Sequence, residues 1–107
     1  MNKSTVAQEA DIDATTLAIT LGVPAVDLDL LKCLNESSPV TARALAEATG
    51  YSRVGLIGHL DKLQRLGMIE SHRVPGVAGT PAKAYTLIKA GVEAAAWSLY
   101  DAITAAI

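Results

Sequence analysis

Residues 41–66 of the chain read TARALAEATGYSRVGLIGHLDKLQRL, and this stretch decides the fold. Thr41 is a suitable N-cap for a helix over residues 42–49, because its hydroxyl can accept a hydrogen bond from an amide of the first turn. Gly50 is expected to end that helix in the left-handed conformation that glycine tolerates. A second helix is expected over residues 53–66. Two helices joined by a short turn that contains glycine form a helix-turn-helix unit.

The second helix of this unit has a regular apolar face. Ser52 is its expected N-cap, and Gly67 is expected to close it. Leucines recur along it at spacings of four, three and three, which is typical of a helix that buries one face. These leucines are Leu56, Leu60, Leu63 and Leu66. The opposite face is therefore expected to be exposed.

The flanking sequence predicts the other elements of a small domain. They are a helix over residues 25–34, a short strand at Val40, strands over 68–74 and 84–88, and a helix over 92–107. The two longer strands enclose residues 75–81, which are rich in glycine and proline, so they are expected to form a hairpin. Gly91 is expected to interrupt the chain before the last helix. Residues 1–22 form an N-terminal extension with a weak apolar stripe, which Ser4 and Thr5 are placed to cap.

The fold class that follows is mainly α with a small β-hairpin wing, an α+β winged helix-turn-helix with extra helices at both ends. A chain of 107 residues fits one domain, whose winged-helix core is expected over residues 25–91. Hydrophobic residues make up 50% of the chain and aromatic residues only 4%, so the core is expected to be aliphatic. In the helix over 25–34, the residues expected to face inward are Val26, Leu30, Leu31 and Leu34.

Charge is distributed unevenly along the chain. The formal net charge of −2 taken alone argues against a protein that binds nucleic acid. Residues 51–90, however, carry six lysines or arginines against two acidic residues, a net +4, whereas residues 1–50 carry three against seven, a net −4. A basic middle between acidic flanks is expected if one surface contacts phosphates, although a solvated charged face is the plainer explanation.

Three segments resemble winged helix-turn-helix regulators of the broad group that contains the MarR, ArsR and PadR families. They are residues 41–46 (the second helix of such domains), 49–70 (the turn, recognition helix and exit strand) and 79–87 (the second wing strand). The resemblance covers residues 25–91. It implies a transcriptional regulator that binds double-stranded DNA sequence-specifically, with the recognition helix over 53–66 in the major groove and the wing over 74–83 on the flanking backbone.

The chain departs from this group at two places. Thr80 occupies a wing position where many members carry a basic residue, which weakens the case for minor-groove reading by the wing tip. Gly55 and Gly58 stand in the recognition helix where members often have polar residues. Each costs a helix about 0.5–1 kcal/mol relative to alanine. Either the two glycines are merely tolerated, or the missing side chains let the backbone approach DNA or a partner closely.

Candidate DNA-binding residues lie on the outward face of the recognition helix and beside the wing. They are Arg43, Ser52, Arg53, Val54, Gly55, Ile57, Gly58, Lys62, Arg73 and Lys83. Arg53, at the N-terminus of the helix, is suited to pair with guanine or a phosphate, and we favour this contact over the alternative of a solvated arginine. Arg43 and Lys62 are placed to reach phosphates. Arg73 and Lys83 are placed to hold the DNA backbone from the two bases of the wing.

Apolar residues on the outward face leave two functions open. Val54 and Ile57 are unusual on an exposed helix face, where they could contact thymine methyl groups or form an apolar patch for a protein partner. The alternative hypothesis is therefore a winged-helix module that binds proteins and has no DNA affinity of its own. Ser52 is expected to serve chiefly as an N-cap, with phosphate contact as its lesser role.

The last predicted helix carries more apolar surface than the exterior of a small domain needs. The candidate interface residues are Trp97, Leu99, Tyr100, Ile103 and Ile107. Either this helix packs back onto its own core, or it forms the seam of a homodimer, together with the N-terminal segment. We favour the dimer, because regulators bind two half-sites with two-fold symmetry.

Other kinds of chemistry find no support in the sequence. Cys33, His59 and His72 lack the paired spacing of metal ligands, and both histidines are expected to be structural. There is no pattern of nucleophile and base, and no phosphate-binding glycine motif, so no cofactor and no enzymatic activity are expected. No apolar stretch approaches the length of a membrane span and no signal peptide is evident. Together with the single cysteine, this predicts a cytoplasmic protein.

Overall fold

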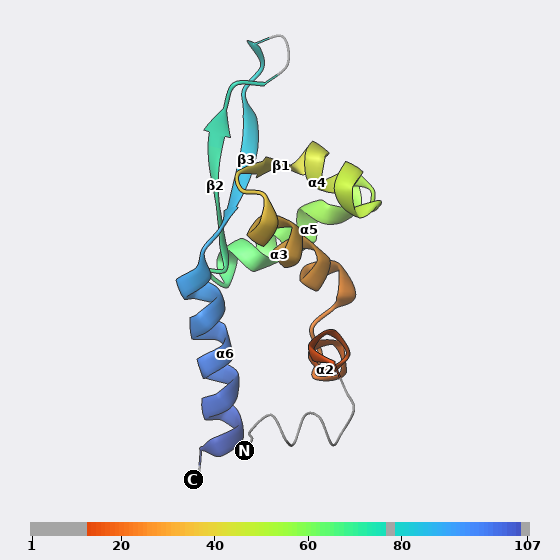
Figure 1. Ribbon diagram of the computed structural model, residues 1–107. Coiled ribbons are helices and arrows are strands. Elements are labelled where there is room, and N and C mark those ends of the chain that lie inside the picture. The colour runs from red at the N-terminus through yellow and green to blue at the C-terminus, as the bar shows by residue number, and fades with distance from the viewer. Residues whose placement is uncertain (1–12, 77–78, 106–107) are drawn as a thin grey trace.

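A computed structural model describes residues 13–76 and 79–105. Its element order confirms the predicted mixture of helices with a small antiparallel sheet (Figure 1). The elements are α2 (Ala14–Thr20), α3 (Ala25–Glu36), β1 (Val40–Thr41), α4 (Ala42–Thr49), α5 (Arg53–Arg65), β2 (Ile69–Val74), β3 (Ala82–Leu87) and α6 (Lys89–Thr104). Asp13 caps α2, whereas the cap predicted at Ser4 and Thr5 lies outside the described residues.

The sheet has the strand order β1-β3-β2, with both pairings antiparallel. The predicted hairpin is confirmed, with Ile69 opposite Leu87 and Val74 opposite Ala82. Its second strand begins two residues earlier than predicted, at Ala82. The short strand at Val40 also forms, and it pairs with Tyr85 at the inner edge of the hairpin. The sheet therefore ties the start of the helix-turn-helix unit to the wing.

The predicted helix-turn-helix unit is confirmed in its local geometry. Thr41 Oγ1 accepts a hydrogen bond from the Ala44 amide at 3.2 Å. Gly50 ends α4 with φ of 82°, in the left-handed region. Ser52 Oγ accepts from the Gly55 amide at 3.0 Å and so caps α5. Each cap satisfies an amide that the helix itself leaves unpaired, which fixes where both helices begin.

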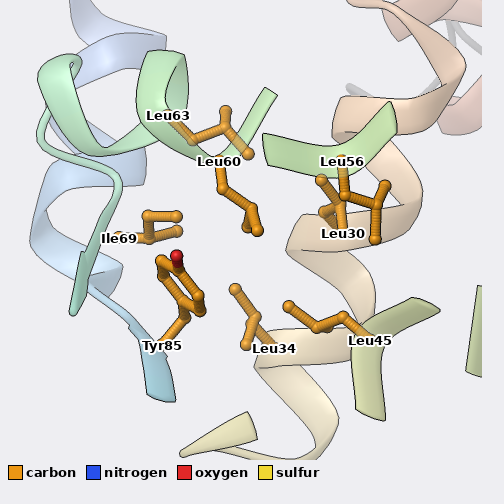
Figure 2. Packing of buried hydrophobic residues seen from close by; sticks show 8 residues of the cluster. All are labelled: Leu30, Leu34, Leu45, Leu56, Leu60, Leu63, Ile69 and Tyr85. Atoms are coloured by element: carbon orange, nitrogen blue, oxygen red, sulfur yellow. The ribbon is translucent and has the colours of Figure 1, made fainter. Parts of the chain in front are cut away.

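The core lies where α3, α4 and α5 meet the sheet, and Figure 2 shows its side chains pointing toward one another. It consists of Leu30, Leu34, Leu45, Leu56, Leu60, Leu63, Ile69 and Tyr85. Leu66, which the leucine repeat assigned to the same face, is 61% exposed, so that prediction is wrong. The reason is local, because Leu66 is the C-cap of α5 and Gly67, with φ of 78°, turns the chain away from the core.

Asp27 ties α3 to α5 from inside the domain. It is only 3% exposed, and its two carboxylate oxygens serve two residues of α5. Oδ1 lies 2.8 Å from His59 Nδ1, and Oδ2 forms an ion pair with Lys62 Nζ. His59 is half-buried, as expected for a structural histidine. A buried carboxylate is costly unless it is paired, so these contacts fix the position of α5 against α3.

The prediction that Gly91 interrupts the chain is wrong. Helix α6 begins at Lys89 and runs through Gly91. A Cβ atom at this position would lie 1.8 Å from the carbonyl oxygen of Gly67, so glycine allows the first turn of α6 to pack directly on the end of α5. The Ile88 amide also donates to the Met68 carbonyl at 2.9 Å. These contacts join α6 to the helix-turn-helix unit.

Gly91→Ala is expected to destabilise the fold by about 1–3 kcal/mol, because the new methyl group has no room beside the Gly67 carbonyl. Gly58→Ala is the matched control, since nothing lies within 4 Å of a Cβ there, and it should stabilise α5 by about 0.5–1 kcal/mol. Urea unfolding of both variants measures the difference. A Gly91→Ala protein at least as stable as wild type would show that the close approach does not exist in solution.

Lys62→Met is expected to lower the free energy of unfolding by about 1–3 kcal/mol, because it leaves the buried Asp27 carboxylate without its cation. Adding Asp27→Asn to that variant should recover part of the loss, since a neutral amide needs no counter-charge. Chemical denaturation of the single and double variants forms the test. If Lys62→Met unfolds at the wild-type midpoint, the ion pair contributes nothing to the stability of the fold.

Candidate nucleic-acid interface

Helix α5 presents a face that the core does not use. Leu56, Leu60 and Leu63 point into the core. Most of the residues that the sequence places on the outward face of α5 are therefore exposed to solvent. Arg53, Val54, Gly55, Ile57 and Gly58 are all exposed. Val54 is 82% exposed, so this face carries an apolar side chain with no packing role inside the domain.

A cleft of about 830 Å³ separates this helix from the wing. Four of the ten candidate DNA-binding residues line it, namely Arg43, Arg53, Ile57 and Lys83. The other lining residues are Thr41, Ala42, Asp61, Pro75, Gly76, Thr80, Ala82 and Tyr85. The fold thus brings together basic side chains from α4, α5 and β3 that lie up to forty residues apart in the chain.

The basic side chains of the cleft are available to an anion. Arg53 and Lys83 have no ion-pair partner within residues 13–76 and 79–105. Arg43 pairs with Glu47 at 3.6 Å, but both side chains are at least 70% exposed, and such a surface pair contributes little. The three cationic groups of the cleft are therefore available to phosphates of a bound duplex.

The wing adds a second basic pair. Arg73 on β2 lies directly opposite Lys83 on β3, and both side chains are exposed. Like charges at opposed positions of an antiparallel pair repel each other. A phosphate bound between them would relieve that repulsion.

Three other candidates, Ser52, Gly55 and Lys62, have a local structural role, and Ser52 is the cap of α5 described above. Lys62 is half-buried and held by Asp27, and it does not line the cleft, so it departs from the outward set in which the sequence placed it. A Cβ at Gly55 would lie 2.8 Å from Ser52 Oγ, so a side chain there would require the capping hydroxyl of α5 to shift. Nothing lies within 4 Å of a Cβ at Gly58, which faces open space.

Asp61 and Tyr85 also line the cleft, although neither is among the residues predicted from the sequence. Tyr85 is buried, and its pKa is raised by burial and further by the nearby negative charge of Asp61. Asp61 is exposed on α5, four residues after Ile57 and eight after Arg53. That helical spacing was the available signal, because residues four apart share one face.

The predicted interface residues of α6 are exposed. Within this helix the structure buries no side chain, and α6 projects away from the helix-turn-helix unit (Figure 1). Exposure is 61% for Trp97, 45% for Leu99, 55% for Tyr100 and 67% for Ile103. The alternative that α6 packs back onto its own core is therefore wrong. Ile107 lies outside the described residues.

Two further observations concern the part of the chain that the structure describes. It contains no cluster of three or more histidine, cysteine or acidic side chains arranged to hold a metal ion. None of its helices combines the length and the apolar character needed to cross a membrane.

The chain resembles a known protein over part of its sequence. No protein-family model matches the chain. An uncharacterized HTH-type transcriptional regulator of Pyrococcus furiosus is 41% identical over 49 residues, which are 46% of this chain and 33% of that protein. The chain thus matches only about a third of the length of this relative.

Solved structures agree over a larger part of the chain. A MarR family transcription regulator superposes with a TM-score of 0.58 and 23% identity, over 92% of this chain and 71% of its own. A mutant of S. aureus MepR superposes with a TM-score of 0.59 and 18% identity, over 92% of this chain and 74% of its own. The transcriptional regulator BldR from Sulfolobus solfataricus superposes with a TM-score of 0.56 and 16% identity, over 97% of this chain and 80% of its own. The chain therefore has the winged helix-turn-helix fold of MarR-like transcription regulators.

Proposed function

We propose that this protein is a transcriptional regulator that binds double-stranded DNA sequence-specifically, with α5 in the major groove and the wing on the flanking backbone. The observation that carries the proposal is the cleft between α5 and the wing, where Arg43, Arg53 and Lys83 converge beside the exposed face of the helix. A helix-turn-helix domain enters the major groove with the N-terminal part of its second helix, which is the part exposed here.

Four residues of the exposed face have a role in this arrangement. Arg53, in the first turn of α5, is placed to donate to a guanine edge or a phosphate. Val54 and Ile57 offer apolar contact to thymine methyl groups. Gly58 leaves the middle of the helix bare, which allows the backbone to approach the floor of the groove. On the wing, Arg73 and Lys83 together hold a phosphate outside the recognised base pairs.

Binding to a random-sequence duplex is expected to weaken steeply as salt rises, because phosphate contacts release counterions. Lys83→Ala should weaken binding about three- to tenfold and reduce the salt slope by about one. Lys32→Ala is the matched control, since Lys32 lies on α3 outside the cleft and bonds to Thr15. Fluorescence anisotropy at several salt concentrations gives both quantities.

Arg53→Ala tests the recognition helix in the same titrations. Its affinity for a duplex selected by the wild-type protein is expected to be about five- to thirtyfold lower than that of wild type. Equal affinities for wild type and Arg53→Ala would remove Arg53 from the interface. If wild type binds no duplex even at low salt, the DNA-binding proposal fails. The exposed Val54 and Ile57 would then favour the protein-interaction module instead.

We also propose that the protein is a homodimer whose seam is α6. Its apolar residues Leu99 and Ile103 lie four apart on one face, beside Tyr100, and Trp97 packs edge-on against Tyr100 with ring centroids 5.4 Å apart. Leu17 and Ile19 of α2 are exposed as well, and so is Leu21, its C-cap. Exposed apolar surface of this extent on two helices marks an interface, and a two-fold dimer presents two recognition helices to two half-sites.

Ile103→Asp is expected to convert the dimer to monomer at micromolar concentration, because it places an unpaired charge in the apolar seam. Ser98→Asp is the matched control, since Ser98 lies on the opposite side of α6 and should leave the mass unchanged. Sedimentation equilibrium measures the mass of each protein. A wild-type protein that is monomeric, or an Ile103→Asp protein that stays dimeric, would contradict α6 as the seam.

A further inference from the structure

Asp61 is the acidic side chain of the otherwise basic cleft. It is exposed on α5 and lines the cleft together with Arg53 and Lys83. Within the described residues its carboxylate has no ion-pair partner closer than 4.0 Å. It caps no helix and lies outside the core, so the fold makes no use of its charge.

The position of Asp61 on α5 places it on the DNA side. Arg53, Ile57 and Asp61 follow one another at intervals of four residues, and all three line the cleft. Eight residues of helix correspond to about 12 Å along the axis. A duplex that contacts Arg53 at the start of α5 and Lys83 on the wing would therefore pass Asp61 about two turns further along the helix.

A carboxylate at this place has two effects on a bound duplex. It repels the phosphates of every sequence, since no cation of the described residues pairs with it within 4.0 Å. It also accepts hydrogen bonds and donates none. Of the groups on base edges in the major groove, the N4 amine of cytosine is the donor that pairs with acidic side chains. Adenine also offers an amine, but its N7 acceptor lies beside that amine and repels a carboxylate.

We propose that Asp61 is a specificity-determining residue of the DNA interface, which weakens binding to duplexes in general and restores it where a cytosine amine faces α5. This inference rests on the proposed DNA-binding function. The basic residues of the cleft alone would favour binding to DNA of any sequence, and Asp61 would reduce this non-specific binding.

Asp61→Asn tests the proposal, because it removes the charge and keeps the shape of the side chain. Its affinity for a random-sequence duplex should rise about three- to tenfold in anisotropy titrations. In selections from a randomised duplex library, wild type should enrich cytosine at one position of each half-site. The variant should lose that preference or replace it with adenine, because asparagine pairs with the N6 and N7 edge of adenine.

Glu36→Gln is the matched control, because Glu36 is exposed on α3 outside the cleft and the substitution changes the net charge equally. The proposal is overturned if Asp61→Asn binds random duplex no tighter than wild type. It is also overturned if Glu36→Gln shows the same gain, or if both proteins select the same bases. Wild-type protein that binds no DNA would refute the proposed function itself, which is a different result from normal binding without an effect of Asp61.

Discussion

The burial of one leucine face of α5 is the constraint on which the rest of the structure depends. Leu56, Leu60 and Leu63 are at most 2% exposed, and they pack against leucines of α3 and α4. Burying each such side chain contributes about 1.5–3 kcal/mol, which is more than any exposed contact of this helix. The core therefore fixes the rotation of α5 about its own axis. Because that rotation is fixed, the opposite face is presented to solvent in one orientation only.

Charges are sorted by the same constraint. The side of α5 that meets α3 carries Lys62, which forms an ion pair with the buried Asp27. The side that meets the wing carries Arg53, which has no ion-pair partner among the described residues. Lys62 and Arg53 are nine residues apart on one helix and thus have different roles. The net charge of a sequence segment counts both in the same way and does not distinguish these roles. The basic character of residues 51–90 becomes a surface only where the wing adds Lys83.

Features set by neighbouring residues could be predicted from the sequence. The caps at Thr41 and Ser52, the left-handed turn at Gly50 and the hairpin are of this kind, because each depends on contacts within a few residues. The pairing of Lys62 with Asp27 could not be predicted, since the two residues are 35 apart and no local pattern joins them. Asp61 is an intermediate case, because its helical spacing from Arg53 and Ile57 is visible in the sequence, whereas only the folded wing shows that this face lines a cleft.

The wrong prediction at Gly91 shows how the sequence can mislead and what the residue does instead. A glycine ahead of an alanine-rich stretch is typical of a break between elements. Here Gly91 lies within the first turn of α6, where the Gly67 carbonyl occupies the space of a side chain. The same joint includes the hydrogen bond from Ile88 to Met68. It connects the end of α5 to the start of α6 without intervening side chains that could repack. If α6 is the dimer seam, the geometry of this joint bears directly on the distance between the two recognition helices, because it sets how α6 leaves the helix-turn-helix unit.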